Sequence, residues 1–308
     1  MNTLIYIIGH TAGGKTGLAT QLCHAIGGEI ISADSRQVYR GMDIGTGKDL
    51  EEYTVNGIEI PYHLIDICMP GDKYNVFEFC NDAKKVLSEI RQRKRQAVLC
   101  GGTGLYIEAL LKNYSMLNVP VNNALRQQLQ DKTLDELSSI LAQYRKLHNH
   151  TDTDTVKRAI RAIEIADYQM HHCEPAGEEP TVEALIFGVA YPRDERRRRI
   201  TERLEFRLNN GMIEEAERLL GNGLSHEDME YYGLEYKFLS MYLLGKINRF
   251  QLFEQLNTAI HQFAKRQMTW FRKMERSGFN IHWLDYTMSH SDTIDSMLAE
   301  IKKLPDTI

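Results

Sequence analysis

The sequence has little of what marks secreted, fibrous or membrane-spanning chains. Its 308 residues include five cysteines, an odd number without a C-x-x-C pair, which argues against a disulfide framework and a structural zinc site. The 7 prolines and 22 glycines are too few for a collagenous or low-complexity chain. No run approaches the ~18 apolar residues of a bilayer span, and the start, MNTLIYIIGH, lacks the basic segment of a signal peptide. We therefore expect a cytoplasmic protein with no membrane partner.

The charge of the chain is weakly negative in sum but uneven along its length. The formal net charge of -5 would by itself argue against a nucleic-acid partner. The 37 lysines and arginines, however, include four local clusters, at residues 91–95, 157–161, 193–207 and 265–276. The first, RQRKR, is typical of a solvated helix face. The other three together indicate a large anionic partner.

Apolar segments alternate with helical patterns through much of the chain. Short runs rich in β-branched residues predict strands at residues 3–9, 29–34, 62–67, 97–102 and 184–191. Helical periodicity between them favours an α/β fold with a parallel sheet flanked by helices. We expect residues 1–115 to form the first part of a catalytic core, residues 116–182 an inserted all-helical domain, and residues 183–308 the rest of the core with C-terminal helices.

The most specific short motif lies directly after the first predicted strand and opens a helix. It matches G-x-x-x-x-G-K-(S/T), the phosphate loop of P-loop NTPase-like folds, and its residues are Gly9, His10, Thr11, Ala12, Gly13, Gly14, Lys15 and Thr16. Glycines let backbone N–H groups converge on phosphate oxygens, Lys15 adds a mobile charge, and Thr16 can ligate Mg²⁺. The motif predicts polyphosphate binding and leaves open whether the ligand is ATP or another diphosphate.

An acidic residue usually ends a strand beside the phosphate loop of a nucleotide-hydrolysing protein. The strand AVLC runs instead into Gly101-Gly102-Thr103-Gly104, without an acid. The candidate acid is Asp34, which closes the segment EIISAD and whose strand end we expect beside the phosphate loop. Asp34 and Thr103 are also ordinary residue types for turns.

Longer blocks of sequence follow the phosphate loop. They read ISADSRQVYRGMDIGTGK (31–48), YHLIDI (62–67), GGTGLY (101–106), KRAIRAIE (157–164), RITERL (199–204) and AKRQMTWFR (264–272). In this order they closely resemble the tRNA dimethylallyltransferases of the bacterial type, which transfer an isopentenyl group to N6 of an adenosine beside the anticodon. We expect no zinc-finger extension of the kind that eukaryotic members carry. His10 and Gly13 stand where the family loop has Pro and Ser, and residues 233–237 (GLEYK) depart from the family pattern G-Y-(K/R)-(E/Q).

The resemblance implies a reaction and assigns catalytic residues. Dimethylallyl diphosphate would lose its diphosphate as the adenine amine attacks, so negative charge grows on the leaving group. The phosphate loop, with Lys15 and a bound Mg²⁺, would stabilise that charge together with Arg203, while Arg196 to Arg199 are expected to form a solvated face. Asp34 matches the family's general base, and Thr103 a position near the reacting centre. An apolar slot near the loop is expected for the five-carbon tail.

The resemblance also implies a tRNA anticodon loop as partner, because a single-stranded adenosine can be flipped into a pocket at small cost. The stretch Asp34, Ser35, Arg36 and Gln37 matches the adenosine contacts, and an amide such as Gln37 suits an adenine edge. The basic clusters would add phosphate and base contacts, from Arg126, Lys157, Arg158, Arg161, Lys265, Arg266 and Arg272. We expect a monomer that uses Mg²⁺.

Two other activities compete with this interpretation. A P-loop small-molecule kinase would bind ATP in the loop and use Asp34 to accept a hydroxyl proton, but the strand AVLC lacks the usual acid. An adenylate isopentenyltransferase would prenylate a free nucleotide, and it would have no use for the KRAIR cluster in the helical insertion.

Overall fold

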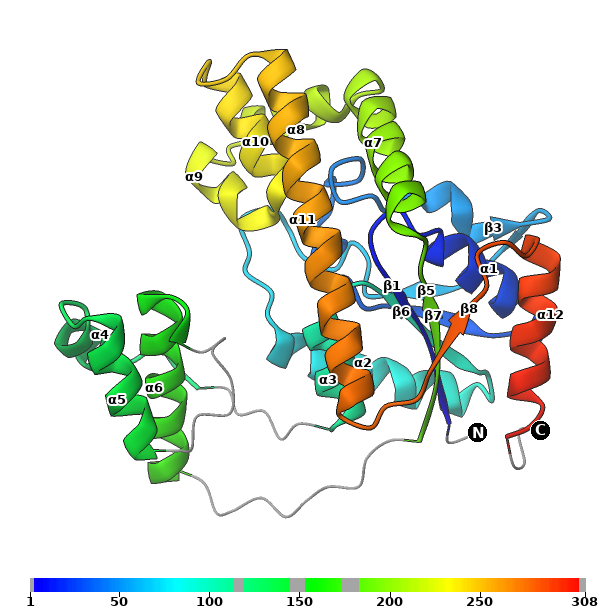
Figure 1. Cartoon of the computed structure of the whole chain (residues 1–308), viewed down its shortest axis with the longest axis horizontal. Coiled ribbons are helices and arrows are strands. Elements are labelled where there is room, and N and C mark those ends of the chain that lie inside the picture. Colours follow the sequence, from blue (N-terminus) through cyan, green and yellow to red (C-terminus); the bar gives the residue numbers. More distant parts are fainter. Residues whose placement is uncertain (1–2, 114–118, 145–152, 173–182, 305–308) are drawn as a thin grey trace. The chain divides into compact units, whose positions relative to one another are not determined.

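The chain divides into two compact units. The computed structural model describes residues 3–113, 119–144, 153–172 and 183–304, and Figure 1 shows their elements. The larger unit comprises residues 1–112 and 181–308, and the smaller unit residues 113–180. None of the helices in the described ranges is long and apolar enough to cross a bilayer.

A six-stranded sheet forms the centre of the larger unit. All its neighbouring strands are parallel, and their order is β5 (Tyr62–His63), β2 (Glu29–Ser32), β6 (Ala97–Gly101), β1 (Leu4–Gly9), β7 (Ala184–Val189) and β8 (Ile281–Leu284). The predicted α/β fold with helices around a mostly parallel sheet is thereby confirmed. The predicted strand at 62–67 is shorter than expected, because Leu64 and Asp66 have φ angles of 62° and 56°, which leave the extended conformation.

Helices cover both faces of this sheet, as Figure 1 shows. On one face lie α1 (Lys15–Ile26) and α12 (His290–Ile301), and on the other α2 (Val76–Gln92), α3 (Gly104–Leu111) and α11 (Arg249–Arg276). The core on the α1 side joins strand residues such as Ile7 and Phe187 to Leu22 of α1 and Met297 of α12. Burial of these side chains holds the carboxyl ends of the strands in fixed register.

Further helices gather near the carboxyl ends of the strands. They are α7 (Arg193–Asn209), α8 (Met212–Gly221), α9 (His226–Met229) and α10 (Leu234–Leu243), with the 3-10 turn η3 (Glu230–Tyr232). A second 3-10 turn, η1 (Leu50–Tyr53), precedes the antiparallel pair β3 (Thr54–Val55) and β4 (Ile58–Glu59). The long helix α11 begins at a capping box formed by Asn248 and Gln251.

The described part of the smaller unit is helical. Its helices are α4 (Asn123–Leu129), α5 (Leu134–Tyr144) and α6 (Val156–His172). They share a small core of their own, in which Leu137 and Leu141 of α5 pack against Ala159 and Ile163 of α6. The unit therefore has its own apolar centre.

Candidate active site

The eight residues of the predicted phosphate loop run from the last residue of β1 to the first residues of α1. Gly9 has a φ of 156°, and a Cβ there would lie 2.4 Å from the carbonyl oxygen of Val189, so only glycine fits where β1 leaves the sheet. Ala12 and Gly14 adopt left-handed backbone, with φ of 56° and 74°. No side chain caps the start of α1 at Gly14, which leaves the N-terminal N–H groups available to an anion.

His10 and Lys15 close the loop on itself. The ring Nδ1 of His10 lies 2.7 Å from the carbonyl oxygen of Thr11, and the Lys15 ammonium donates to the His10 carbonyl at 2.8 Å. Burial, reinforced by the charge of Lys15, lowers the pKa of His10 from 6.5 to about 4, so the imidazole is neutral. A Cβ at Gly13 would lie 2.9 Å from the His10 carbonyl oxygen, which accounts for glycine at this position of the loop.

Gln267 of α11 fixes the loop from outside. Its Oε1 accepts from the Thr11 N–H at 2.9 Å, and its Nε2 donates to the Gly102 carbonyl at 2.9 Å. The side chain therefore joins the phosphate loop to the turn after β6. Gln267 had no predicted role, although the sequence holds a signal for one: this polar residue interrupts the otherwise apolar buried stripe of an amphipathic helix.

Helix α7 presents three arginines at four-residue spacing to the loops at this edge. Arg199 donates from Nε to the Ala12 carbonyl at 3.1 Å. This corrects the expectation that Arg196 to Arg199 form only a solvated face, because four residues are close to one helical turn and so place Arg199 on the same side as Arg203. Arg198, in contrast, is exposed and pairs with glutamates of its own helix.

Arg203 and Arg207 both bind the carboxylate of Asp49. The Arg203 Nη2 lies 2.6 Å from Asp49 Oδ2, and the Arg207 Nη2 lies 2.7 Å from Oδ1. Burial alone would raise the pKa of Asp49, but the two guanidinium charges outweigh it and lower that pKa. No sequence motif pairs Asp49 with Arg207, and only the fold brings them together.

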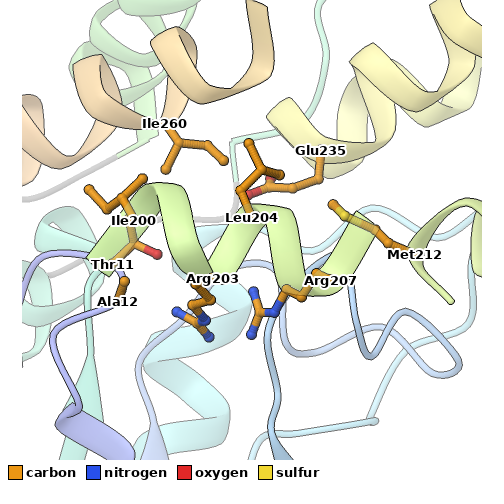
Figure 2. A pocket seen from close by; sticks show the side chains of 9 residues that line it. All are labelled: Thr11, Ala12, Ile200, Arg203, Leu204, Arg207, Met212, Glu235 and Ile260. Carbon is orange, nitrogen blue, oxygen red and sulfur yellow. The ribbon is translucent and has the colours of Figure 1, made fainter. Parts of the chain in front are cut away.

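A pocket lies between the phosphate loop, α7 and α10. Figure 2 shows its lining, in which Arg203 and Arg207 project from one side of α7. The apolar lining consists of Ile200, Leu204, Met212 and Ile260. Thr11, Ala12 and Glu235 complete it. Burial raises the pKa of Glu235, although the charges of Arg207 and Arg203 oppose this.

Asp34 follows β2 and lies one strand further from the phosphate loop than expected, because β6 separates β2 from β1. Its Oδ1 accepts from the Arg36 N–H at 2.9 Å, which is a turn-forming contact. The Thr103 hydroxyl accepts from the Ser35 N–H at 3.1 Å. The turns after β2 and β6 are therefore held together, and they bring Asp34 and Thr103 to one place at the edge of the sheet.

Arg36 and Gln37 are engaged by the protein itself. Arg36 donates to the Tyr231 carbonyl at 2.5 Å, and its guanidinium lies 5.5 Å from the centre of the Tyr231 ring. The Gln37 amide accepts from the Ser32 hydroxyl at 2.8 Å and donates to the Gly47 carbonyl at 3.0 Å. One lone pair and one N–H of this amide remain for another partner.

The basic residues assigned to RNA have different surroundings. In the smaller unit, Arg126 and Arg161 both pair with Glu164, whose side chain is 1% exposed, so both have a structural role there. Arg158 pairs with Asp154, and Lys157 is exposed. In the larger unit, Lys265, Arg266 and Arg272 are exposed along α11.

The phosphate loop lies at the start of α1, with arginines of α7 against it and the Asp34 carboxylate at the same edge of the sheet. This arrangement is that of a P-loop enzyme. Residues 37–274 match the model of a family described as IPP transferase. The chain belongs to this family, and the family predicted from the sequence is confirmed.

Similar proteins align with nearly the whole chain. It is 56% identical over 295 residues to tRNA dimethylallyltransferase 2 of Phocaeicola vulgatus, with 96% of each chain covered. It is 54% identical over 300 residues to tRNA dimethylallyltransferase 2 of Bacteroides fragilis, with 97% of this chain and 98% of the relative covered. The chain is therefore a transferase of the prenyltransferase class, as expected.

Two solved structures resemble the fold. The tRNA delta(2)-isopentenylpyrophosphate transferase of Staphylococcus epidermidis is 31% identical with a TM-score of 0.71, over 98% of this chain and 99% of that one. A eukaryotic dimethylallyltransferase acting on tRNA has a TM-score of 0.80 at 20% identity, over 100% of this chain and 81% of that one. The second likeness concerns the fold alone.

Proposed function

We propose that this chain transfers the dimethylallyl group of dimethylallyl diphosphate to N6 of an adenosine next to the anticodon of tRNA, with release of diphosphate. The observation that carries the proposal is the phosphate loop at the uncapped start of α1, with Arg199 of α7 donating to its Ala12 carbonyl and Arg203 of the same helix nearby. Such a cluster of N–H groups and cations suits the diphosphate end of the donor. Family membership and the names of the relatives support the same activity.

The reaction forms one bond and breaks one. The adenine N6 attacks the allylic carbon of the donor, an N–C bond forms, and the C–O bond breaks with its electron pair leaving on the diphosphate. We assign stabilisation of the leaving group to the N–H groups of the phosphate loop, to Lys15 and to Arg203. We assign Asp34 as the base that takes the N6 proton, because the Arg36 N–H holds its Oδ1, while its Oδ2 accepts no hydrogen bond from the residues that the structure describes. Thr103 positions the Asp34 turn through Ser35.

Mg²⁺ fits this site as a partner of the substrate. No group of three His, Cys, Asp or Glu residues in the described ranges is placed to hold a metal by itself. The Thr16 hydroxyl is an oxygen ligand at the start of α1, and Mg²⁺ commonly combines one or two protein oxygens with phosphate oxygens and water. When bound, the ion would neutralise part of the diphosphate charge.

The RNA side of the proposal rests on residues after β2 and on basic residues of both units, some exposed and some half-buried. Ser35, Arg36 and Gln37 follow the assigned base and are proposed to contact the adenosine. Phosphate and base contacts are proposed for both units, from Arg126, Lys157, Arg158, Arg161, Lys265, Arg266 and Arg272. We further propose that the protein acts as a monomer in the cytoplasm.

Mass analysis of tRNA nucleosides tests the function. Unmodified tRNA is incubated with the protein, dimethylallyl diphosphate and Mg²⁺, and the nucleosides are expected to include the prenylated adenosine. Lys15→Ala should abolish the product, whereas Lys85→Ala, which removes an exposed lysine of α2, should retain it. Tight ATP binding with steady phosphate release and no prenyl transfer would instead establish a kinase or ATPase.

A further inference from the structure

Asp49 supplies the anion between two arginines that face the proposed diphosphate site. Its carboxylate binds Arg203 through Oδ2 and Arg207 through both oxygens, at 2.6, 2.7 and 2.9 Å. All three side chains keep some access to solvent, with 30% of Asp49, 29% of Arg203 and 13% of Arg207 exposed. The ion cluster of Asp49 with the two arginines is thus partly desolvated, but a competing ligand can still reach it.

The backbone around Asp49 is shaped to bring it there. A Cβ at Gly47 would lie 2.5 Å from the Nη2 atoms of both Arg203 and Arg207, so the chain passes directly against the guanidinium groups. Asp49 itself has a φ of 46°, in the left-handed region, just before the turn η1. Aspartate is one of the few residue types that adopt this conformation readily.

The two arginines are the cations that an incoming diphosphate would meet next to the phosphate loop. Both line the same pocket as Thr11 and Ala12, as Figure 2 shows. Among the residues that the structure describes, no carboxylate other than Asp49 forms an ion pair with Arg203 or Arg207. Any diphosphate that uses Arg203 must therefore share it with Asp49 or displace Asp49.

We propose that Asp49 is an internal counter-anion for the diphosphate site, and that Arg207 is a second diphosphate contact beside Arg203. In the free enzyme Asp49 holds both guanidinium groups. The diphosphate takes them over when the donor binds, and Asp49 recovers them as the diphosphate product leaves. Asp49 is a positioning residue in this scheme, which rests on the proposed function.

The physical basis is an exchange of charge-assisted hydrogen bonds. Guanidinium groups bind phosphate oxygens in the same bidentate manner as a carboxylate, and a diphosphate offers more oxygens and more charge than one aspartate. Exchange in its favour is therefore possible when the donor enters. Two partly buried guanidinium groups without an anion are unfavourable, so recapture by Asp49 assists product release. Without Asp49 the product should bind more tightly.

Binding of magnesium pyrophosphate tests the inference through the sign of the change. Asp49→Asn keeps the shape and a residue type that tolerates left-handed backbone, but removes the charge. We expect pyrophosphate to bind the variant about tenfold or more tightly than the wild type, by calorimetry and as a product inhibitor. Multiple-turnover prenyl transfer should show a burst followed by a slower phase, because product release becomes limiting.

Two further variants separate exchange from other effects. Glu202→Gln removes the same charge from an exposed side chain of α7 that pairs with Arg198, and it should leave pyrophosphate affinity unchanged. Arg207→Gln should weaken pyrophosphate binding by about tenfold in the wild type, and by more in the Asp49→Asn background, where no carboxylate competes for Arg207. Thermal melting checks that each variant is folded.

Weaker or unchanged pyrophosphate binding by folded Asp49→Asn would overturn the inference, because it would mean that Asp49 only supports the arginines. Full pyrophosphate affinity in folded Arg207→Gln would equally remove the second contact. Either result with a wild-type protein that transfers the prenyl group leaves the proposed function intact. A wild-type protein that transfers no prenyl group overturns the proposed function instead.

Discussion

The Tyr236 hydroxyl donates a hydrogen bond of 2.7 Å to Oε1 of Glu215. The same buried carboxylate accepts the backbone N–H groups of Asp43, Ile44 and Gly45, at 2.8, 2.8 and 2.9 Å. A Cβ at Gly45 would lie 2.6 Å from Cζ of the tyrosine ring, so glycine is required for this approach. The segment 233–237, which departs from the family pattern, thus anchors the loop that leads to Asp49.

Tyr236→Phe should destabilise the larger unit. The change leaves one oxygen of a buried carboxylate without its hydroxyl donor, which costs about 1–3 kcal/mol. Denaturant unfolding measures the effect. Tyr286→Phe, at a ring that is 50% exposed, is the control and should stay within about 0.5 kcal/mol of the wild type. Equal stabilities of the two variants would show that the contact is unimportant.

Asp34→Asn should abolish the proposed base with little change of shape. Turnover is expected to fall by about 10² or more, since an amide cannot take the N6 proton. Affinity for tRNA should change little, because the amide oxygen can still accept from the Arg36 N–H. Single-turnover prenyl transfer and tRNA binding are measured together. Near wild-type turnover would remove Asp34 from the mechanism.

Replacing Lys265 and Arg266 together by Ala should weaken tRNA binding and its dependence on salt. Each phosphate contact that is lost removes counterion release, so the slope of log K against log salt should flatten by roughly 1 to 2. Lys84 and Lys85 of α2, replaced together, give a control with the same loss of charge. Equal slopes would assign Lys265 and Arg266 to a solvated face. Arg126 and Arg161 suit this test less, because they pair with Glu164.

Dimethylallyl diphosphate should displace ATP from the protein readily. The N–H groups of the loop bind either anion, whereas the apolar slot that the family resemblance implies near the loop would favour the five-carbon tail. Competition binding measures the order, and Arg203→Ala should lower turnover as well as donor affinity. Preference for ATP over the prenyl donor would contradict the assignment of the pocket.

The free energy of unfolding should decrease as the pH is lowered, because His10 titrates. Its pKa is lowered to about 4 in the folded chain, so the unfolded chain binds more protons between pH 6.5 and 4. The contribution is complete above pH 6.5 and is lost as the pH falls toward 4. At about 1.4 kcal/mol per pH unit it amounts to roughly 3 kcal/mol. His10→Asn should show a flatter stability profile over this range. Parallel profiles would mean that the imidazole is not buried in its neutral form.

The parts of the site that depend on local backbone geometry were predictable from the sequence. The phosphate loop is one, because its glycines and lysine are constrained within eight residues that join a strand to a helix. Arg199, Arg207 and Asp49 were not, since their roles depend on how α7 crosses two loops distant in the chain. A run of four arginines also hides which one faces inward.

The elements of the fold that the sequence did not predict are mainly short strands. β8 has only four residues, and its polar His282 and half-buried Trp283 give no apolar run. It forms because β7 offers an open edge at Phe187 and Gly188. The two-residue strands β3 and β4 are below the length at which alternation can be recognised.

The order in which β1 gains its neighbours has a consequence for synthesis of the chain. β6, on one side, precedes the inserted helical unit, while β7, on the other, follows it. A nascent chain released only as far as the insertion leaves one edge of β1 open, and Gly9 lacks the close packing against Val189. Gln267 emerges later still, so Thr11 lacks its acceptor until the ribosome has translated most of α11. The anion-binding loop therefore gains its full set of contacts only after Gln267 has been translated, and a product terminated before that residue lacks the contact to the Thr11 N–H.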